Sequence, residues 1–207
     1  MERIYGVFDN DLDGTLEALK TEKDTIEKSF HDSQDKLADI EKWRIICRLH
    51  YNQGYEEFKK SLTFEANRIT IFHFSGHHSQ EQLELNDAKI NDDAIIEILN
   101  NAIKLKIVFL NGCNTQDAIK KLTNVPVVIG TTKAIPDELA MEVSTQFYKL
   151  LTQDLENFSE GERISAIFEQ AVDFQKLKDK SIKRGGGKAF TKEELEEALE
   201  YLSLIHI

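Results

Sequence analysis

The stretch ITIFHFSGHH, residues 69–78, decides the fold. It opens with Ile69–Phe74, a short run of mostly apolar residues, and such a run is typical of a strand buried on both faces of a parallel sheet. A glycine and two histidines follow within four residues. The pattern recurs at Ile107–Leu110 (IVFL), which runs into Asn-Gly-Cys at 111–113. We therefore expect two buried parallel strands, each with reactive side chains just past its carboxyl end.

Strands and helices alternate on both sides of these two runs. Further strands are predicted from apolar, β-branched stretches, and helices from apolar residues at helical spacing. The additional strands are Arg3–Phe8, Trp43–His50 and Val125–Gly130. The helices are Leu16–Phe30, Tyr55–Phe64, Asp92–Ile103, Gln116–Leu122, Asp137–Leu151 and Glu162–Leu177. This alternation predicts an α/β fold with a mostly parallel sheet and helices on both faces.

The first and last of these helices each show an inward face at helical spacing. The residues predicted to share such a face are Leu16, Leu19, Lys23 and Ile26 in the first helix, and Ile164, Ile167, Ala171 and Phe174 in the last. Both faces are expected to pack against the sheet.

Composition and charge limit the function classes. The chain has 207 residues, 41% of them hydrophobic and 30% charged, which suits one domain with a packed core. The formal net charge of −11 disfavours nucleic acid or an anionic membrane as the main partner. Two cysteines make no disulfide framework, so we expect a reduced, cytoplasmic setting. Neither a signal peptide nor a membrane span is expected in this fragment.

The C-terminal part differs from the rest. We expect residues 1–178 to form the main domain, and residues 179–201 to hold a linker, with KRGGGK at Lys183–Lys188, and the start of a truncated following segment. The final six residues, LSLIHI at 202–207, are similar to the translation of a transposase adaptor used in shotgun libraries. We therefore expect them to be an artefact of sequencing, with an ordinary apolar helix end as the alternative.

The reactive residues past the two central strands suggest a nucleophile and its base. Parallel strands that are neighbours lie about 4.8 Å apart, so side chains past their carboxyl ends can converge. His77 and Cys113 hold these places, and an imidazole beside a thiol makes an activated nucleophile. Each residue alone has a structural alternative, since a cysteine at a strand end is commonly a small buried residue.

The other histidines and the second cysteine are interpreted as structural. His73 lies within the predicted strand, so we expect a buried, hydrogen-bonded side chain rather than a ligand. No acidic or cysteine residue at a metal-like spacing accompanies His73, His77 and His78, which disfavours zinc. Cys47 lies inside a predicted strand and is expected to be part of the core.

HFSGHH (73–78) together with FLNGCNT (109–115) resembles the CHAT peptidases, bacterial relatives of caspases and separases. Three further segments are similar to the family, at 7–26, 125–151 and 164–171, so the resemblance covers about residues 1–177. It implies a caspase-like three-layer sandwich and a cysteine endopeptidase. It also implies a place in a bacterial signalling, defence or cell-death system, with sensor or effector domains in the missing C-terminal region or on a partner chain.

By this resemblance Cys113 takes the place of the nucleophile and His77 that of the base. The backbone N–H groups of His78 and Cys113 would hold the oxyanion, although the family often has glycine or another small residue at position 78. A helix beginning after Cys113 would lower the pKa of its thiol. The implied reaction is acyl transfer on a protein or peptide substrate, with no metal or organic cofactor.

The substrate and two other functions stay open at this point. Asp137 could line a pocket for a basic P1 residue, or it could cap the helix at 138–151. A catalytically silent CHAT scaffold is the main alternative function, against which the presence of both His77 and Cys113 argues. A nucleotide-binding flavodoxin-like domain is disfavoured, because the acidic DNDLDG at 9–14 would repel phosphate.

Overall fold

Five parallel strands form the centre of the protein. The computed structural model describes residues 2–9, 18–35, 45–79, 82–153, 161–177 and 197–206. The strand order in the main sheet is β2-β1-β3-β7-β8-β9, with β9 antiparallel to β8. The strands are β1 (Glu2–Asp9), β2 (Ile45–Tyr51), β3 (Ile71–Gly76), β7 (Ile107–Asn111), β8 (Val127–Thr131) and β9 (Leu202–His206).

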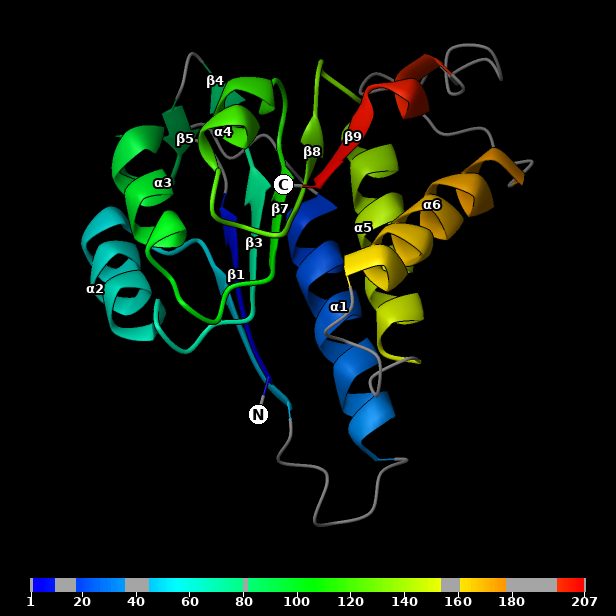
Figure 1. The fold of residues 1–207 in the computed structure, drawn as a ribbon, viewed down its shortest axis with the longest axis horizontal. Coiled ribbons are helices and arrows are strands. Elements are labelled where there is room, and N and C mark those ends of the chain that lie inside the picture. Colours follow the sequence, from blue (N-terminus) through cyan, green and yellow to red (C-terminus); the bar gives the residue numbers. More distant parts are fainter. Residues whose placement is uncertain are drawn as a thin grey trace.

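Helices cover both faces of this sheet, which makes three layers (Figure 1). One face carries α1 (Ala18–Gln34), α5 (Asp137–Leu151) and α6 (Gly161–Leu177). The other carries α2 (Tyr55–Glu65), α3 (Asp92–Asn100) and α4 (Gln116–Lys121). The predicted α/β class, with a mostly parallel sheet between helical layers, is confirmed.

Strand β7 shows why the sheet needs a layer on each side. Successive side chains of a strand point to opposite faces. Ile107 and Phe109 therefore belong to the core under α1, α5 and α6, whereas Val108 and Leu110 belong to the core under α2, α3 and α4. All four are buried, so a continuous apolar run was the correct signal for this strand.

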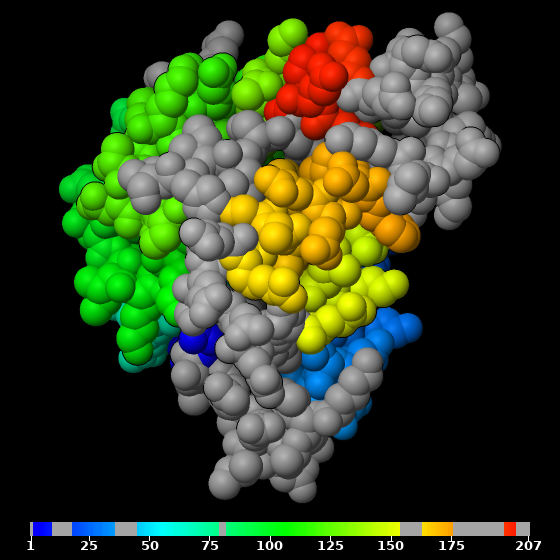
Figure 2. Space-filling model, turned by 45° about the vertical axis from the view of Figure 1, so that its right-hand side comes forward, coloured from blue at the N-terminus to red at the C-terminus, as the bar shows by residue number. Residues whose placement is uncertain are grey.

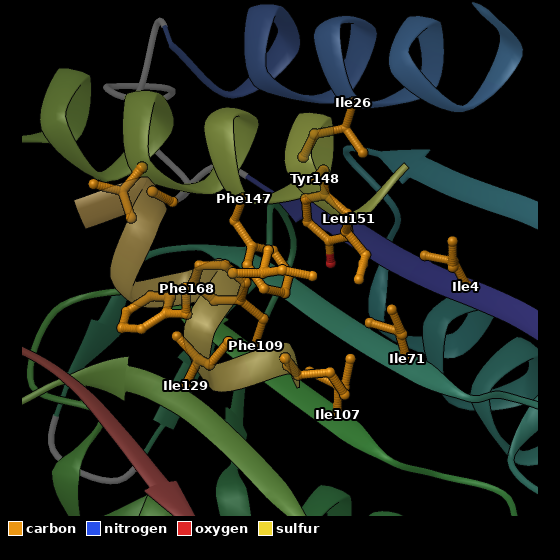
Figure 3. Close-up of a cluster of buried hydrophobic side chains, with 14 of the residues drawn as sticks. Ile4, Ile26, Ile71, Ile107, Phe109, Ile129, Phe147, Tyr148, Leu151 and Phe168 are labelled. Atoms are coloured by element: carbon orange, nitrogen blue, oxygen red, sulfur yellow. The ribbon is translucent and has the colours of Figure 1, made fainter. Parts of the chain in front are cut away.

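Aromatic rings fill the core beneath α5 and α6 (Figure 3). The ring of Phe109 lies edge-on to those of Phe147 and Phe168, with centroids 5.5 and 6.2 Å apart. In Figure 2 this side of the molecule runs from the C-terminal segment in red through α6 in orange and α5 in yellow to α1 in blue. Of the residues predicted on the inward face of α6, Ile164, Ile167 and Ala171 are buried. Phe174 is exposed instead, and the aromatic residue of this helix in the core is Phe168.

The inward face of α1 also differs from the prediction. Leu19, Ile26 and Phe30 are buried there, and the fourth buried residue is Glu22 rather than Lys23. Lys23 lies half-buried beside this face and pairs with Glu27 over 2.9 Å. Positions 22 and 23 both lie at helical spacing from Leu19 and Ile26, so spacing alone does not decide which of them faces the core. The predicted first turn, from Leu16, lies outside the described residues.

A second, smaller sheet follows β3 directly and was not predicted. Its antiparallel strands are β4 (His78–Ser79), β5 (Gln82–Glu84) and β6 (Lys89–Asn91), and α3 begins where β6 ends. Strands of two or three residues are too short to show the alternation on which a strand prediction depends.

The C-terminal residues contact the main domain. A short helical turn places Ala198 and Leu199 in the core beneath α6, and β9 then lies along β8. The predicted linker at 183–188 lies outside the described residues. The interpretation of residues 202–207 as adaptor-derived stays a prediction. Among the helices that the structure describes, none combines the length and apolarity needed to cross a bilayer.

Candidate active site

His77 and Cys113 occupy equivalent places beyond two neighbouring strands. Strands β3 and β7 pair in parallel, with Ser75 opposite Asn111. His77 is the second residue after Ser75, and Cys113 is the second residue after Asn111. The expectation that the two strands are neighbours is therefore confirmed. This edge of the sheet also lies beside the reversal of strand order between β1 and β3, where ligands of parallel sheets bind.

Glycines let the loops beyond these strands approach each other. A Cβ atom on Gly112 would lie 2.8 Å from the carbonyl oxygen of Gly76, closer than carbon and oxygen pack. Directly after the cysteine, Asn114 has φ of 56°, a left-handed conformation that asparagine tolerates better than most residues. The two loops are thus in contact, and the chain turns sharply after Cys113.

His77 and Cys113 line one open pocket. The start of α5 contributes Asp137 to the same pocket, and α1 contributes Glu22. Both histidine and cysteine are half-buried, so each is reachable from solvent. The structure therefore brings together His77, Cys113 and Asp137, which the sequence analysis singled out. It adds Glu22, which that analysis did not consider.

Burial governs the charge state of the Cys113 thiol. Burial raises its pKa, the negative charge of Asp137 raises it further, and a hydrogen bond from the backbone of Ile135 opposes both. The expectation that a following helix would lower this pKa is wrong. The helix α4 has only six residues and begins three residues later, at Gln116. A base is therefore needed to take the thiol proton.

Asp137 is a pocket residue rather than a helix cap. It is the first residue of α5, the cap position is held by Pro136, and no side chain caps this helix. Partial burial raises the pKa of Asp137, whereas the nearby His77 lowers it. The alternative of an N-cap role, left open by the sequence, is thus wrong. The carboxylate lies where it influences both His77 and Cys113 electrostatically.

Sequence reasoning missed Glu22, a fully buried carboxylate at the base of the pocket. It accepts hydrogen bonds from Ser75 over 2.6 Å, from Asn111 over 2.8 Å and from Ser144. Burial would raise the pKa of Glu22, but His73 and the two hydroxyls outweigh this effect and lower it. A glutamate three residues after Leu19, on an apolar face, was the signal that could have found it.

His78 has a buried side chain with two partners. It begins β4, and its ring lies between the carboxylate of Asp92 and the backbone carbonyl of Cys113. The sequence suggested only a backbone role for this residue, as a donor to the oxyanion, and that role stays a prediction. The side-chain contacts depend on where α3 packs, which the local sequence does not reveal.

The residues interpreted as structural are in the core. His73 is buried as predicted, but the predicted hydrogen bond is not formed, because Nε2 lies 3.5 Å from Glu22 Oε1, within ion-pair range only. Cys47 packs against the main core, and burial raises its pKa to about 12. Both cysteines are free. In the described part of the chain, no three or more histidine, cysteine or acidic side chains are grouped so as to hold a metal ion.

The comparisons with known proteins bear on the fold. No family model matches this sequence, and no curated protein does. Solved structures do match across 99% of the chain. The Arg-specific cysteine proteinase gingipain R has 12% identity and a TM-score of 0.64, and a complex of the pro- and mature domains of Porphyromonas gingivalis RgpB has 11% and 0.59. A secreted C11 cysteine protease from Bacteroides thetaiotaomicron, solved with an irreversible peptide inhibitor, has 13% and 0.55.

These likenesses establish the fold as that of the caspase-like cysteine proteases, and the predicted three-layer sandwich is confirmed. The chain spans 46%, 66% and 47% of the length of the three matched chains. The narrower resemblance to CHAT peptidases stays a prediction.

Proposed function

We propose that the protein is a cysteine endopeptidase in which Cys113 is the nucleophile and His77 its base. The observation that carries this proposal is their shared pocket at the carboxyl ends of two paired strands. The likeness in fold to cysteine proteases supports the same class of chemistry. A silent scaffold would need neither residue, nor an open pocket between them.

The proposed reaction is acyl transfer through a thioester. His77 takes the proton of the Cys113 thiol, and the thiolate sulfur bonds to the carbonyl carbon of the scissile peptide. Backbone N–H groups of Cys113 and His78 stabilise the resulting oxyanion. The C–N bond then breaks, and the leaving amine takes the proton from His77. Water next hydrolyses the thioester, with His77 again as base. Because burial raises the pKa of the thiol, the transfer to His77 is needed before attack.

For the substrate, we propose a peptide with a basic P1 residue. Asp137 lines the pocket beside the two reacting groups, and its carboxylate can pair with a lysine or arginine side chain. The net charge of −11 also favours approach of a basic peptide. Gingipain R, one of the similar structures, is described as Arg-specific.

We further propose that the peptidase is regulated. In the setting implied by the CHAT resemblance, it belongs to a bacterial, cytoplasmic signalling, defence or cell-death system. Sensor or effector domains would lie on a longer chain or on a partner. The two free cysteines are compatible with a reducing compartment.

The test is covalent labelling with peptidyl acyloxymethyl ketones bearing Arg or Leu at P1. Wild type and Cys47→Ala should be labelled, whereas Cys113→Ala and His77→Ala should not, with folding checked by circular dichroism. Stronger labelling by the Arg probe would support the basic P1 preference. If the folded, reduced wild-type protein stays unlabelled both alone and in its full-length chain, the silent scaffold is the better account.

A further inference from the structure

Both ring nitrogens of His78 face hydrogen-bond acceptors. Nδ1 lies 3.1 Å from the backbone carbonyl oxygen of Cys113, and Nε2 lies 2.7 Å from Oδ2 of Asp92. The His78 and Asp92 side chains are only 2% and 3% exposed, so water does not mediate these contacts freely. A carbonyl oxygen only accepts hydrogen bonds, and so does an ionised carboxylate. With Asp92 ionised, both contacts are satisfied only when both nitrogens carry a proton.

A neutral imidazole has one N–H group, so it would leave one of these contacts as lone pair against lone pair. The additional proton therefore belongs to the pair, on either the ring or the carboxyl group. Asp92 is the first residue of α3, where the helix dipole favours a negative charge. This places the proton on the ring.

We propose that His78 is an imidazolium ion, held by Asp92, that positions the backbone of Cys113 and brings a positive charge to the residue that carries the thiol. The positioning role rests on the proposed peptidase function, whereas the charge state does not. The pair links α3 to the loop that carries the nucleophile. The loop is also close to His78 itself, since a Cβ on Gly112 would lie 3.2 Å from the His78 Cβ.

The charged and titratable groups around this ring are few among the described residues. From α3 it faces Asp92, and from the loop after β7 it faces Cys113. Its chain neighbour His77 lies in the pocket, and Asp93, next to Asp92, is paired with Lys121 over 2.9 Å. Burial and the charge of Asp137 disfavour the Cys113 thiolate. A positive charge on the neighbouring ring would act in the opposite direction.

The charge state is tested on the wild-type protein by NMR of ¹⁵N-labelled histidine side chains at pH 7.5, with His78→Gln used for assignment. We expect both His78 nitrogens to be protonated. The control is His31, which pairs with Asp35 on the exposed surface of α1 at 3.2 Å. His31 gives the reference spectrum of a solvent-exposed histidine in the same sample. A neutral His78 ring would overturn the proposal.

The positioning role is tested by the rate of Cys113 alkylation with iodoacetamide across pH, in a Cys47→Ala background. His78→Gln and Asp92→Asn should both slow the reaction at pH 7 by roughly tenfold, the change expected for about one pKa unit. His31→Gln should not. Both variants are checked for folding by amide NMR spectra. An unchanged pH profile in a folded variant would overturn the role. Neither the NMR spectrum nor the alkylation rate depends on peptide hydrolysis. Failure of the proposed peptidase function, which is tested by probe labelling, can therefore be told apart from failure of this proposal.

Discussion

The side-chain amide of Asn111 donates a hydrogen bond to Glu22, with 2.8 Å between Nδ2 and Oε1. This bond ties Asn111, the last residue of β7 and two places before Cys113, to the buried face of α1. The same carboxylate accepts from Ser75 on β3 and Ser144 on α5. Glu22 therefore connects the two strands that carry the candidate dyad with two helices that cover them.

The first prediction concerns the stability that this carboxylate provides. Glu22→Gln keeps the shape of the side chain but removes the charge and one acceptor from a buried site. We expect a loss of about 1–3 kcal/mol in the free energy of unfolding, measured with urea. Glu27→Gln, on the exposed side of the same helix, should change it by only a few tenths of a kcal/mol. Equal effects of the two substitutions would contradict the assigned network.

The second prediction concerns acid stability. The pKa of Glu22 is lower in the folded protein than its usual value. At a pH between the folded and unfolded values, the unfolded chain therefore binds more protons than the folded protein. Its contribution to stability is thus present above the unfolded value, about 4.3, and is lost as pH falls through the folded value. Unfolding free energy measured from pH 6 to pH 3 should fall more steeply for wild type than for Glu22→Gln. Parallel curves would argue against this linkage.

The third prediction concerns the contact between the two loops. Gly112→Ala would place a Cβ 2.8 Å from the backbone oxygen of Gly76, and backbone cannot yield as a side chain can. We expect about 1–3 kcal/mol of destabilisation and loss of probe labelling at Cys113. The matched control is Gly54→Ala, whose Cβ would meet only the Asp87 side chain. Thermal unfolding and labelling of both variants check this, and a tolerated Gly112→Ala would show that the loops can separate.

The fourth prediction concerns Asp137. Its negative charge raises the pKa of the Cys113 thiol, so Asp137→Asn should shift the pH profile of alkylation to lower pH. Labelling by the Arg probe should fall relative to the Leu probe, because the partner of the basic side chain is gone. Asp117→Asn is the control, since this exposed residue pairs with Lys120 on α4. If Asp137→Asn kept the preference for the Arg probe, a residue other than Asp137 would have to bind the P1 side chain.

The fifth prediction separates the two cysteines. Burial raises the pKa of Cys47 to about 12, and the side chain packs against the core. Cys113 lines the open pocket. Limited treatment of the native protein with iodoacetamide at pH 8, followed by peptide mass spectrometry, should modify Cys113 first. Both should react at similar rates in urea, which removes the protection of Cys47.

The central strands and the meeting of His77 with Cys113 could be predicted because they follow from local patterns. Apolar runs define buried strands, and parallel pairing then aligns whatever follows them. The hydrogen bonds of Glu22 and the contact of His78 with Asp92 could not be predicted in this way. Each joins elements that meet only after the layers pack, so the apolar spacing that places Glu22 on the inward face of α1 does not reveal its partners.

The base of the candidate dyad has an unusual place in the chain. His77 is the single residue between β3, which ends at Gly76, and β4, which begins at His78. Its carbonyl oxygen is held by the backbone N–H of Glu84 at 2.9 Å, next to the small sheet. The imidazole is thus carried at the joint between two sheets, whereas Cys113 follows the large sheet and meets the small one at the ring of His78. A tilt of the small sheet against the large one would therefore change the separation of His77 and Cys113.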